Sequence, residues 1–181
     1  MSLADRPEPT LPANFIRQIP TGDDRKRRIC GDCGFINYHN PKVVVGTLAT
    51  FEDRVLLCQR AIVPGKGLWT HPAGHLERDE TAEQGAIRET LEETRAQVSI
   101  VELLGVFSAP HKAVVEIIYR ARLRSDEIGP TSESTAVKLF RYEDIPWDEI
   151  AFPSTAWAIA RAREPRPALR LDTPPEFLAV S

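Results

Sequence analysis

The residues best suited to chemistry in this sequence are three closely spaced glutamates, Glu89, Glu92 and Glu93. In a helix, positions i, i+3 and i+4 share one face, and like charges at that spacing cost roughly a few tenths of a kcal/mol per pair. A hard divalent cation prefers carboxylate oxygen ligands and would offset this repulsion. We therefore expect the three carboxylates to bind Mg²⁺ or Mn²⁺. The alternative is a solvated acidic helix face without a ligand.

The element that must present these glutamates is a predicted helix over residues 82–94. Thr81, followed three residues later by Gln84, matches a capping box, and most residues after it favour helix. Ile87, Leu91 and Thr94 are predicted to lie opposite the carboxylates and to pack on a sheet. The chain supplies that sheet from strands predicted at 43–51, 55–60, 98–107, 114–123 and 136–142, and a last helix is predicted at 155–163.

Two residues beside the glutamates strengthen this interpretation. Gly74 lies upstream of the helix, where a missing Cβ permits an unusual turn and close approach of the backbone to a metal or substrate. Arg88 precedes Glu89 and can hold a carboxylate through a bidentate hydrogen bond. This spacing resembles the signature of the Nudix hydrolases, which it matches at six positions: Gly74, Glu80, Arg88, Glu89, Glu92 and Glu93.

Four residues in and beside the signature lie outside its pattern. Arg95 stands where the signature ends with a glycine, and a non-glycine residue with positive φ costs roughly 1 kcal/mol. Thr90 stands where the signature has an apolar residue. His71 and His75 flank the site, and we expect each to be a surface residue or a support for the site rather than a catalyst.

The resemblance extends over about residues 28–163, including NPKVVVG at 40–46 and GLWTHPAGHLE at 67–77. It is closest to the Nudix branch of FAD and ADP-ribose pyrophosphatase-like proteins. This implies an α/β fold, an α/β/α sandwich with a mixed sheet between helices. It also implies a homodimer and hydrolysis of a nucleoside diphosphate linked to another moiety, giving two monophosphates, with Mg²⁺ or Mn²⁺ as cofactor. No segment resembles the SQPWPFP stretch of the NADH pyrophosphatases, which counts against NADH as the preferred substrate.

The resemblance implies catalytic roles for the acidic residues. Glu89 and Glu93 would be the principal metal ligands, with Glu92 as a further ligand and the Gly74 carbonyl as a backbone ligand. A glutamate must also accept the proton of the attacking water, and Glu92 and Glu133 are both candidates. The chemistry would consist of positioning and charge neutralisation, without a covalent intermediate.

Other residues are expected to support or contact the substrate site. Arg88 would orient a ligand carboxylate, and Glu80 would hold the loop or Arg88. Arg60 and Trp69 are candidate substrate contacts, although a tryptophan beside a strand also suits core packing. The branch carries a second glutamate where Ala136 stands. That difference keeps open an alternative function, a non-catalytic Nudix-fold module that senses a nucleotide.

Length and composition favour one main domain with additional ends. The 181 residues divide into a predicted leader at 1–41, a Nudix domain at 42–165 and a tail at 166–181. No apolar run reaches the roughly 18 residues of a membrane helix, and the first residues lack the pattern of a signal peptide. The net charge of −3 argues against a nucleic-acid partner, RNA included. An odd count of three cysteines favours a reducing compartment, so we predict a cytoplasmic protein.

The leader contains half of a zinc ribbon. Cys30 and Cys33 form a CxxC pair, but tetrahedral zinc requires four ligands. Cys58 falls in an apolar strand pattern and is predicted to be in the core, while His39 is a third ligand by proximity in the sequence alone. We therefore do not expect a structural zinc ion.

Overall fold

The computed structural model describes residues 14–164 and 171–172. The chain divides into two compact units, Met1–Pro41 and Lys42–Ser181, and each is described by itself. The start of the predicted leader lies outside the described residues, as does the predicted tail apart from a short strand at Leu171–Asp172. Within the described part of the chain, none of the helices combines the length and apolar character needed to cross a bilayer.

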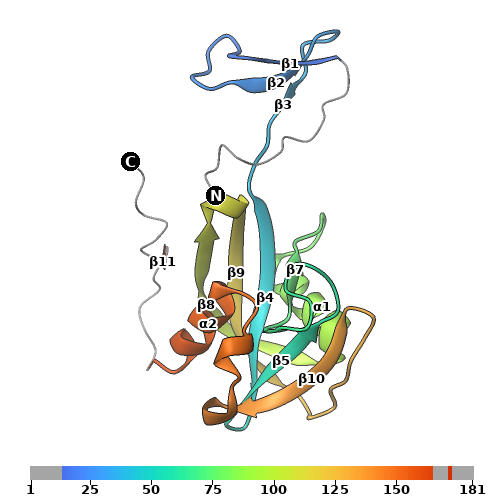
Figure 1. The fold of residues 1–181 in the computed structure, drawn as a ribbon, viewed down its shortest axis with the longest axis vertical. Coiled ribbons are helices and arrows are strands. Elements are labelled where there is room, and N and C mark those ends of the chain that lie inside the picture. Colours follow the sequence, from blue (N-terminus) through green and yellow to red (C-terminus); the bar gives the residue numbers. More distant parts are fainter. Residues whose placement is uncertain (1–13, 165–170, 173–181) are drawn as a thin grey trace. The chain divides into compact units, whose positions relative to one another are not determined.

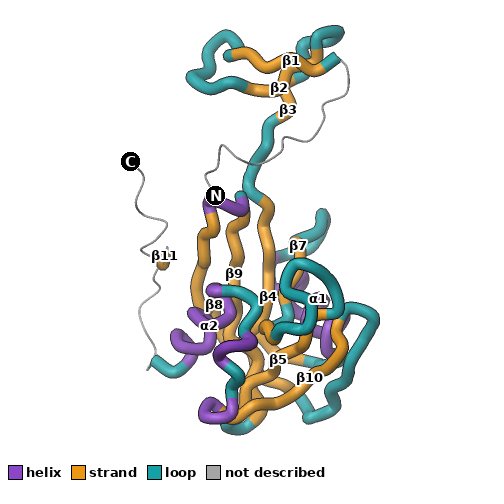
Figure 2. The backbone as a smooth tube through the Cα atoms, in the orientation of Figure 1, coloured by secondary structure: helices purple, strands orange, loops and turns teal. Residues whose placement is uncertain are grey.

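The first unit is a small antiparallel sheet, whose three strands are orange in Figure 2. The strands are β1 (Phe15–Gln18), β2 (Arg27–Cys30) and β3 (Ile36–Asn37), with β2 in the centre. Cys30 ends β2, and the Gly34 N–H donates to the Cys30 carbonyl at 2.9 Å. The CxxC pair therefore occupies the turn between β2 and β3.

The second unit is built on a mixed sheet (Figure 1) with the strand order β10-β5-β4-β9-β8-β11. The pairs β4–β9 and β8–β11 are parallel, and the other pairs in this order are antiparallel. The short strands β6 and β7 add to β5 and β4. All five predicted strands are confirmed. The bounds are β4 Lys42–Phe51, β5 Arg54–Arg60, β6 Trp69–Thr70, β7 Ala73–His75, β8 Val98–Ala109, β9 Val114–Leu123, β10 Ser134–Arg141 and β11 Leu171–Asp172.

Two helices cover opposite faces of this sheet, α1 (Ala82–Thr94) and α2 (Pro153–Ala162). Neighbouring residues of a strand point to opposite faces. Leu48 of β4 belongs to the core cluster that contains Ala158 and Ile159 of α2, whereas Val45 packs with Ala86 of α1. The predicted α/β/α arrangement is therefore confirmed.

The prediction for the buried face of α1 is confirmed for Thr94, which is fully buried, and is wrong for Ile87 and Leu91. Ile87 and Leu91 are 37% and 48% exposed, while the face that carries Glu89 and Glu93 is turned inward. The buried Thr90 explains how a polar face packs on the sheet, because its hydroxyl donates to the Ala86 carbonyl and contacts the Thr47 hydroxyl of β4, each at 2.7 Å. The helix thus carries its carboxylates at the edge of its packed face.

Both ends of α1 agree with the sequence. The Thr81 side chain accepts from the Gln84 N–H, and the Gln84 side chain accepts from the Thr81 N–H, which confirms the capping box. At the other end, Arg95 adopts the left-handed conformation with φ 58°, and its N–H donates to the Leu91 carbonyl at 2.8 Å. Arg95 thus takes the backbone position that glycine usually fills at a helix end.

Candidate active site

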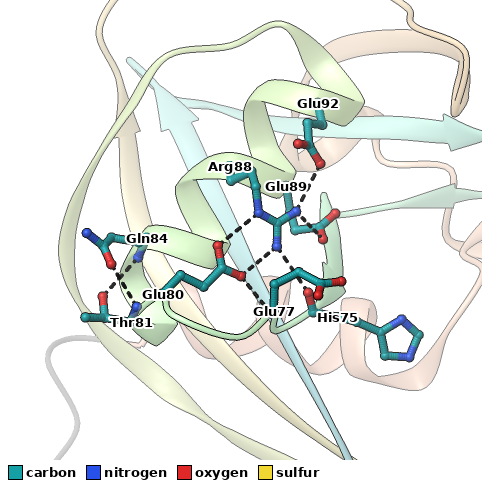
Figure 3. Close-up of polar contacts among 8 residues, drawn as sticks. All are labelled: His75, Glu77, Glu80, Thr81, Gln84, Arg88, Glu89 and Glu92. Carbon is teal, nitrogen blue, oxygen red and sulfur yellow. Dashed lines mark hydrogen bonds and ion pairs between the residues drawn. The ribbon is translucent and has the colours of Figure 1, made fainter.

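Arg88, in the middle of α1, gathers three carboxylates (Figure 3). Its Nε and Nη2 donate to the two oxygens of Glu80 at 3.0 and 2.7 Å, the bidentate arrangement that fits a guanidinium to a carboxylate. Its Nη1 donates to Glu89 at 2.8 Å and to Glu92 at 3.0 Å, and Nη2 also donates to the His75 carbonyl at 3.1 Å. One side chain therefore fixes the helix to the loop before it.

Glu80 fastens that loop from the other side. Besides Arg88, it accepts a hydrogen bond from the Glu77 N–H at 2.8 Å. These bonds, led by those from Arg88, lower the pKa of Glu80 to about 2. Glu80 is consequently ionised at neutral pH, and Figure 3 shows its carboxylate facing the Arg88 guanidinium.

Gly74 is needed because the Glu89 carboxylate lies against it. A Cβ atom at Gly74 would lie 2.2 Å from the Glu89 Cδ, far inside van der Waals contact. Gly74 pairs with Val45 in the sheet and is not among the glycines with positive φ. The expected unusual turn is therefore wrong, and the close approach is made by the backbone to the Glu89 side chain.

Glu93 is the most buried glutamate of α1, with 7% of its surface exposed against 9% for Glu89. Its Oε2 accepts from the Ala73 N–H at 3.0 Å and from the Cys58 thiol at 3.7 Å. Burial is the main cause that raises the pKa of Glu93 to about 7, and the negative charge of Glu89 adds to it. Burial likewise raises the pKa of Glu89. Both carboxylates therefore lack the solvation that would stabilise their ionised forms.

Glu133 lies close enough to influence the glutamates of α1. Its negative charge contributes to the raised pKa of Glu89, and its backbone carbonyl accepts from the Ala61 N–H at 3.0 Å. The next residue, Ser134, donates from its buried hydroxyl to the Glu93 carbonyl at 2.6 Å, tying β10 to α1. The pairing of β10 with β5 brings this segment, which is distant in the sequence, to the site.

The two candidate substrate contacts lie on neighbouring strands. The ring of Trp69 meets that of Phe140 edge-on at 4.9 Å and packs against the core, which agrees with its packing interpretation. Arg60 is partly exposed, and its Nε donates to the Pro64 carbonyl at 2.7 Å. Its positive charge lowers the pKa of Glu93 against the effect of burial, so Arg60 lies near the acidic residues.

His71 is more important to the structure than the sequence indicated. It is 1% exposed, so the surface interpretation is wrong. Its Nε2 lies 3.0 Å from Glu116 Oε1, and its Nδ1 lies 2.9 Å from the Thr155 hydroxyl. Burial opposes ionisation of Glu116, but the bond to His71 and weaker contacts lower its pKa overall. No local pattern could reveal this network, because its members come from separate elements.

The three cysteines divide between the two units. Cys58 is buried in β5, which confirms the core prediction. Backbone N–H groups of Cys33 and Asp32 lower the pKa of Cys30, together with a hydrogen bond from the Cys33 thiol. The Nε2 of His39 lies 3.1 Å from Nη1 of Arg28.

The chain that carries this site matches a known protein family. The profile of the NUDIX domain matches residues 40–158, most of the chain and the whole of the acidic site. The protein is a member of the Nudix family. A zinc-ribbon family described as Nudix N-terminal matches residues 13–39 of the same protein, which confirms the resemblance of the leader.

Similar proteins include curated relatives and a solved structure. This Nudix protein is 34% identical over 102 residues to a MutT-like protein of Streptomyces ambofaciens, covering 56% of this chain and 64% of the relative. It is 28% identical over 113 residues to an ADP-ribose pyrophosphatase of Methanocaldococcus jannaschii, covering 60% and 67%. The chain thus spans about two thirds of these relatives. A NUDIX hydrolase crystal structure from Nitrosomonas europaea is 44% identical with a TM-score of 0.83, covering 88% of this chain and 93% of that one.

The donor set at this Nudix site fits a hard divalent cation. Glu89 and Glu93 offer carboxylate oxygens whose ionised forms are disfavoured by burial, and a bound cation would remove that penalty. In the arrangement described, Arg88 and the Ala73 N–H hold these carboxylates. The donors that the structure presents are this pair: within residues 14–164 and 171–172, no cluster of three or more His, Cys, Asp or Glu side chains is arranged to hold a metal, and Glu92 is instead held by Arg88.

Proposed function

We propose that this protein is a metal-dependent hydrolase that cleaves the pyrophosphate bond of a nucleoside diphosphate linked to another moiety. The observation that carries the proposal is the pair of buried carboxylates, Glu89 and Glu93, beside the Arg88 ion-pair network. Two such groups in a poorly solvated place are costly, and a site for divalent cations and a diphosphate gives them a function. ADP-ribose is the first candidate substrate, because the relative from Methanocaldococcus jannaschii is an ADP-ribose pyrophosphatase. FAD is the second candidate.

Each acidic residue has a proposed part in this reaction. Glu89 and Glu93 would hold Mg²⁺ or Mn²⁺, with Glu92 and the Gly74 carbonyl as further ligands. When bound, such a cation polarises phosphoryl oxygens and lowers the pKa of water. Glu92 or Glu133 would accept the proton of the attacking water.

The positively charged and supporting residues complete the site. Arg88 would keep the Glu89 carboxylate oriented, because its own position is fixed by Glu80. Arg60 would contact the substrate, and Trp69 is a second candidate contact.

The test is release of AMP from ADP-ribose and from FAD with Mg²⁺ or Mn²⁺. Glu93→Gln should lower kcat by at least about 100-fold, the scale of losing a main electrostatic group. Glu83→Gln provides the matched control, because Glu83 is an exposed glutamate of the same helix. Equal turnover by the wild-type protein and Glu93→Gln would rule out the proposed role of Glu93.

The second candidate function is a nucleotide-sensing module without catalytic activity. It is motivated by Ala136, which stands where related enzymes carry a second glutamate. Tight binding of ADP-ribose with no product formed at either metal ion would favour the sensor over the hydrolase.

Three further proposals rest on the sequence and, for the homodimer, on its family resemblance. We infer a homodimer, a cytoplasmic location and a leader without zinc, since the CxxC pair supplies two of the four ligands that tetrahedral zinc needs. Sedimentation of the full chain tests the homodimer, and the zinc content of the purified protein tests the leader without zinc.

A further inference from the structure

Two positively charged side chains from distant parts of the chain lie on the ring of Phe152. The guanidinium carbon of Arg60 is 5.0 Å from the ring centroid, and the Lys112 Nζ is 5.3 Å from it. Arg60 ends β5, Lys112 ends the 3-10 turn η2 (Pro110–Lys112), and Phe152 caps the start of α2. We call these three residues the cation cluster.

Contact with the Phe152 ring contributes too little energy to explain why two cations lie side by side. A cation on an aromatic face gains about 0.5–1 kcal/mol at an exposed site, while two like charges repel each other. Among the described residues, neither Arg60 nor Lys112 forms an ion pair with a carboxylate. The hydrogen bond from Arg60 Nε to the neutral Pro64 carbonyl uses one of five guanidinium donors. The cluster therefore retains positive charge for an anion.

The cation cluster borders the acidic site. Although burial raises the pKa of Glu93, the charge of Arg60 lowers it, and Lys112 acts in the same direction on the buried Glu116. The sheet adds a geometric connection, because Arg60 pairs with Ser134 of β10, and the Ser134 hydroxyl donates to the Glu93 carbonyl at 2.6 Å. Positive charge thus lies next to a group of glutamates that would otherwise repel a diphosphate.

The Arg60 stem is held in place by its surroundings. A Cβ atom at Gly65 would lie 3.4 Å from Arg60 Cδ and 3.3 Å from the Ala151 Cβ, so the loop after β5 packs against both residues. A side chain that is already ordered loses less entropy when it binds a ligand. Lys112 is exposed, but its ammonium group lies over the ring of the partly buried Phe152, which orders the side chain.

We propose that Arg60 and Lys112, supported by Phe152, bind the phosphoryl group of a diphosphate substrate that lies farther from the glutamates. The inference rests on the proposed function and deepens it, because it divides the diphosphate between two parts of the site. Arginine offers paired donors to phosphate oxygens, and lysine offers a compact charge. A diphosphate has one phosphoryl group for the glutamates and their cations and a second for the cation cluster, so the cluster favours diphosphates over monophosphates.

Charge removal at Lys112 tests this proposal. Lys112→Met keeps the length of the side chain, and Phe152→Leu removes the ring. The matched control is Lys138→Met, because Lys138 also lies over an aromatic ring, 4.7 Å from the centroid of Phe140 in β10. The first measurement is calorimetric titration with inorganic pyrophosphate in Mg²⁺, and the second is kcat and KM for ADP-ribose.

Lys112→Met should weaken pyrophosphate binding about tenfold, the loss expected for one charged hydrogen bond. KM for ADP-ribose should rise by a similar factor while kcat stays within about twofold, as for an interaction made equally in the ground and transition states. Phe152→Leu should weaken binding by a smaller factor, and Lys138→Met should match the wild type. Thermal unfolding shows whether each variant is folded.

Wild-type affinity for pyrophosphate in Lys112→Met would overturn the proposal, and so would failure of the wild-type protein to bind pyrophosphate. The proposed function fails separately. If pyrophosphate binding depends on Lys112 but no nucleoside diphosphate derivative is hydrolysed, the cation cluster stands and the hydrolase proposal does not.

Discussion

Two carboxylates of this site have pKa values that are shifted in opposite directions. Glu80 is held by Arg88 and a backbone N–H, which lower its pKa to about 2. Glu93 is buried with fewer compensating bonds, and its pKa is raised to about 7. Two glutamates thirteen residues apart therefore differ in their protonation at mildly acidic pH because of their surroundings and not because of their type.

The raised pKa of Glu93 predicts how metal-free protein responds to pH. The unfolded chain releases this proton near pH 4.5, whereas the folded chain keeps it until about pH 7. The free energy of unfolding should therefore fall between these pH values, by on the order of 3 kcal/mol. Urea denaturation in EDTA measures this fall, and Glu93→Gln should flatten it. An unchanged slope in Glu93→Gln would assign the effect to another group.

At the scale of elements, a pair of buried hydroxyls joins α1 to the centre of the sheet. Thr90 donates to the Ala86 carbonyl within the helix, so its contact with Thr47 at 2.7 Å is donated by the Thr47 hydroxyl. This pair explains how threonine replaces the apolar residue expected in the signature. It also keeps the acidic face of the helix against β4.

Valine substitutions should show strong coupling between these two threonines. Thr90→Val leaves the buried Thr47 hydroxyl without its acceptor and should cost about 1–3 kcal/mol, more than Thr47→Val. The double variant should cost less than the two single losses added together, because two apolar groups of similar shape then pack. Urea denaturation of all four proteins completes the cycle. Simple additivity would show that the hydroxyls do not act as a pair.

At the scale of the whole second unit, His71 and Glu116 join three elements behind the acidic site. His71 follows β6, Glu116 belongs to β9, and Thr155, which contacts the His71 ring, belongs to α2. The segment after His71 leads to Ala73, whose N–H binds Glu93. The same buried network thus holds α2 on the sheet and positions the segment from His71 to Ala73, which contacts Glu93.

Glu116→Gln should destabilise the protein by about 1–3 kcal/mol at neutral pH. Its lowered pKa contributes stability that is present above about pH 4.5 and is lost as pH falls through the folded value. The difference in the free energy of unfolding between the wild-type protein and Glu116→Gln should therefore become smaller as the pH falls. Glu102→Gln is the control, because Glu102 pairs with Arg120 at 2.9 Å but is 38% exposed, and such pairs contribute little.

The sequence by itself determined the two helices and five long strands of the second unit and singled out the acidic residues. Local rules suffice for these features, since a capping box, strand alternation and the spacing from Gly74 to Glu93 depend on neighbours along the chain. The two layers of helix around a mixed sheet followed from the family resemblance and agree with the structure.

The tertiary structure decided which face of α1 is buried, where His71 lies and which cations meet at Phe152. Each of these depends on contacts between residues far apart in the chain, such as Thr47 with Thr90 and Arg60 with Phe152. A helix with few apolar residues gives a weak signal for its buried face. Burial and pairing, which set the pKa of each glutamate, exist only after the sheet has brought these segments together.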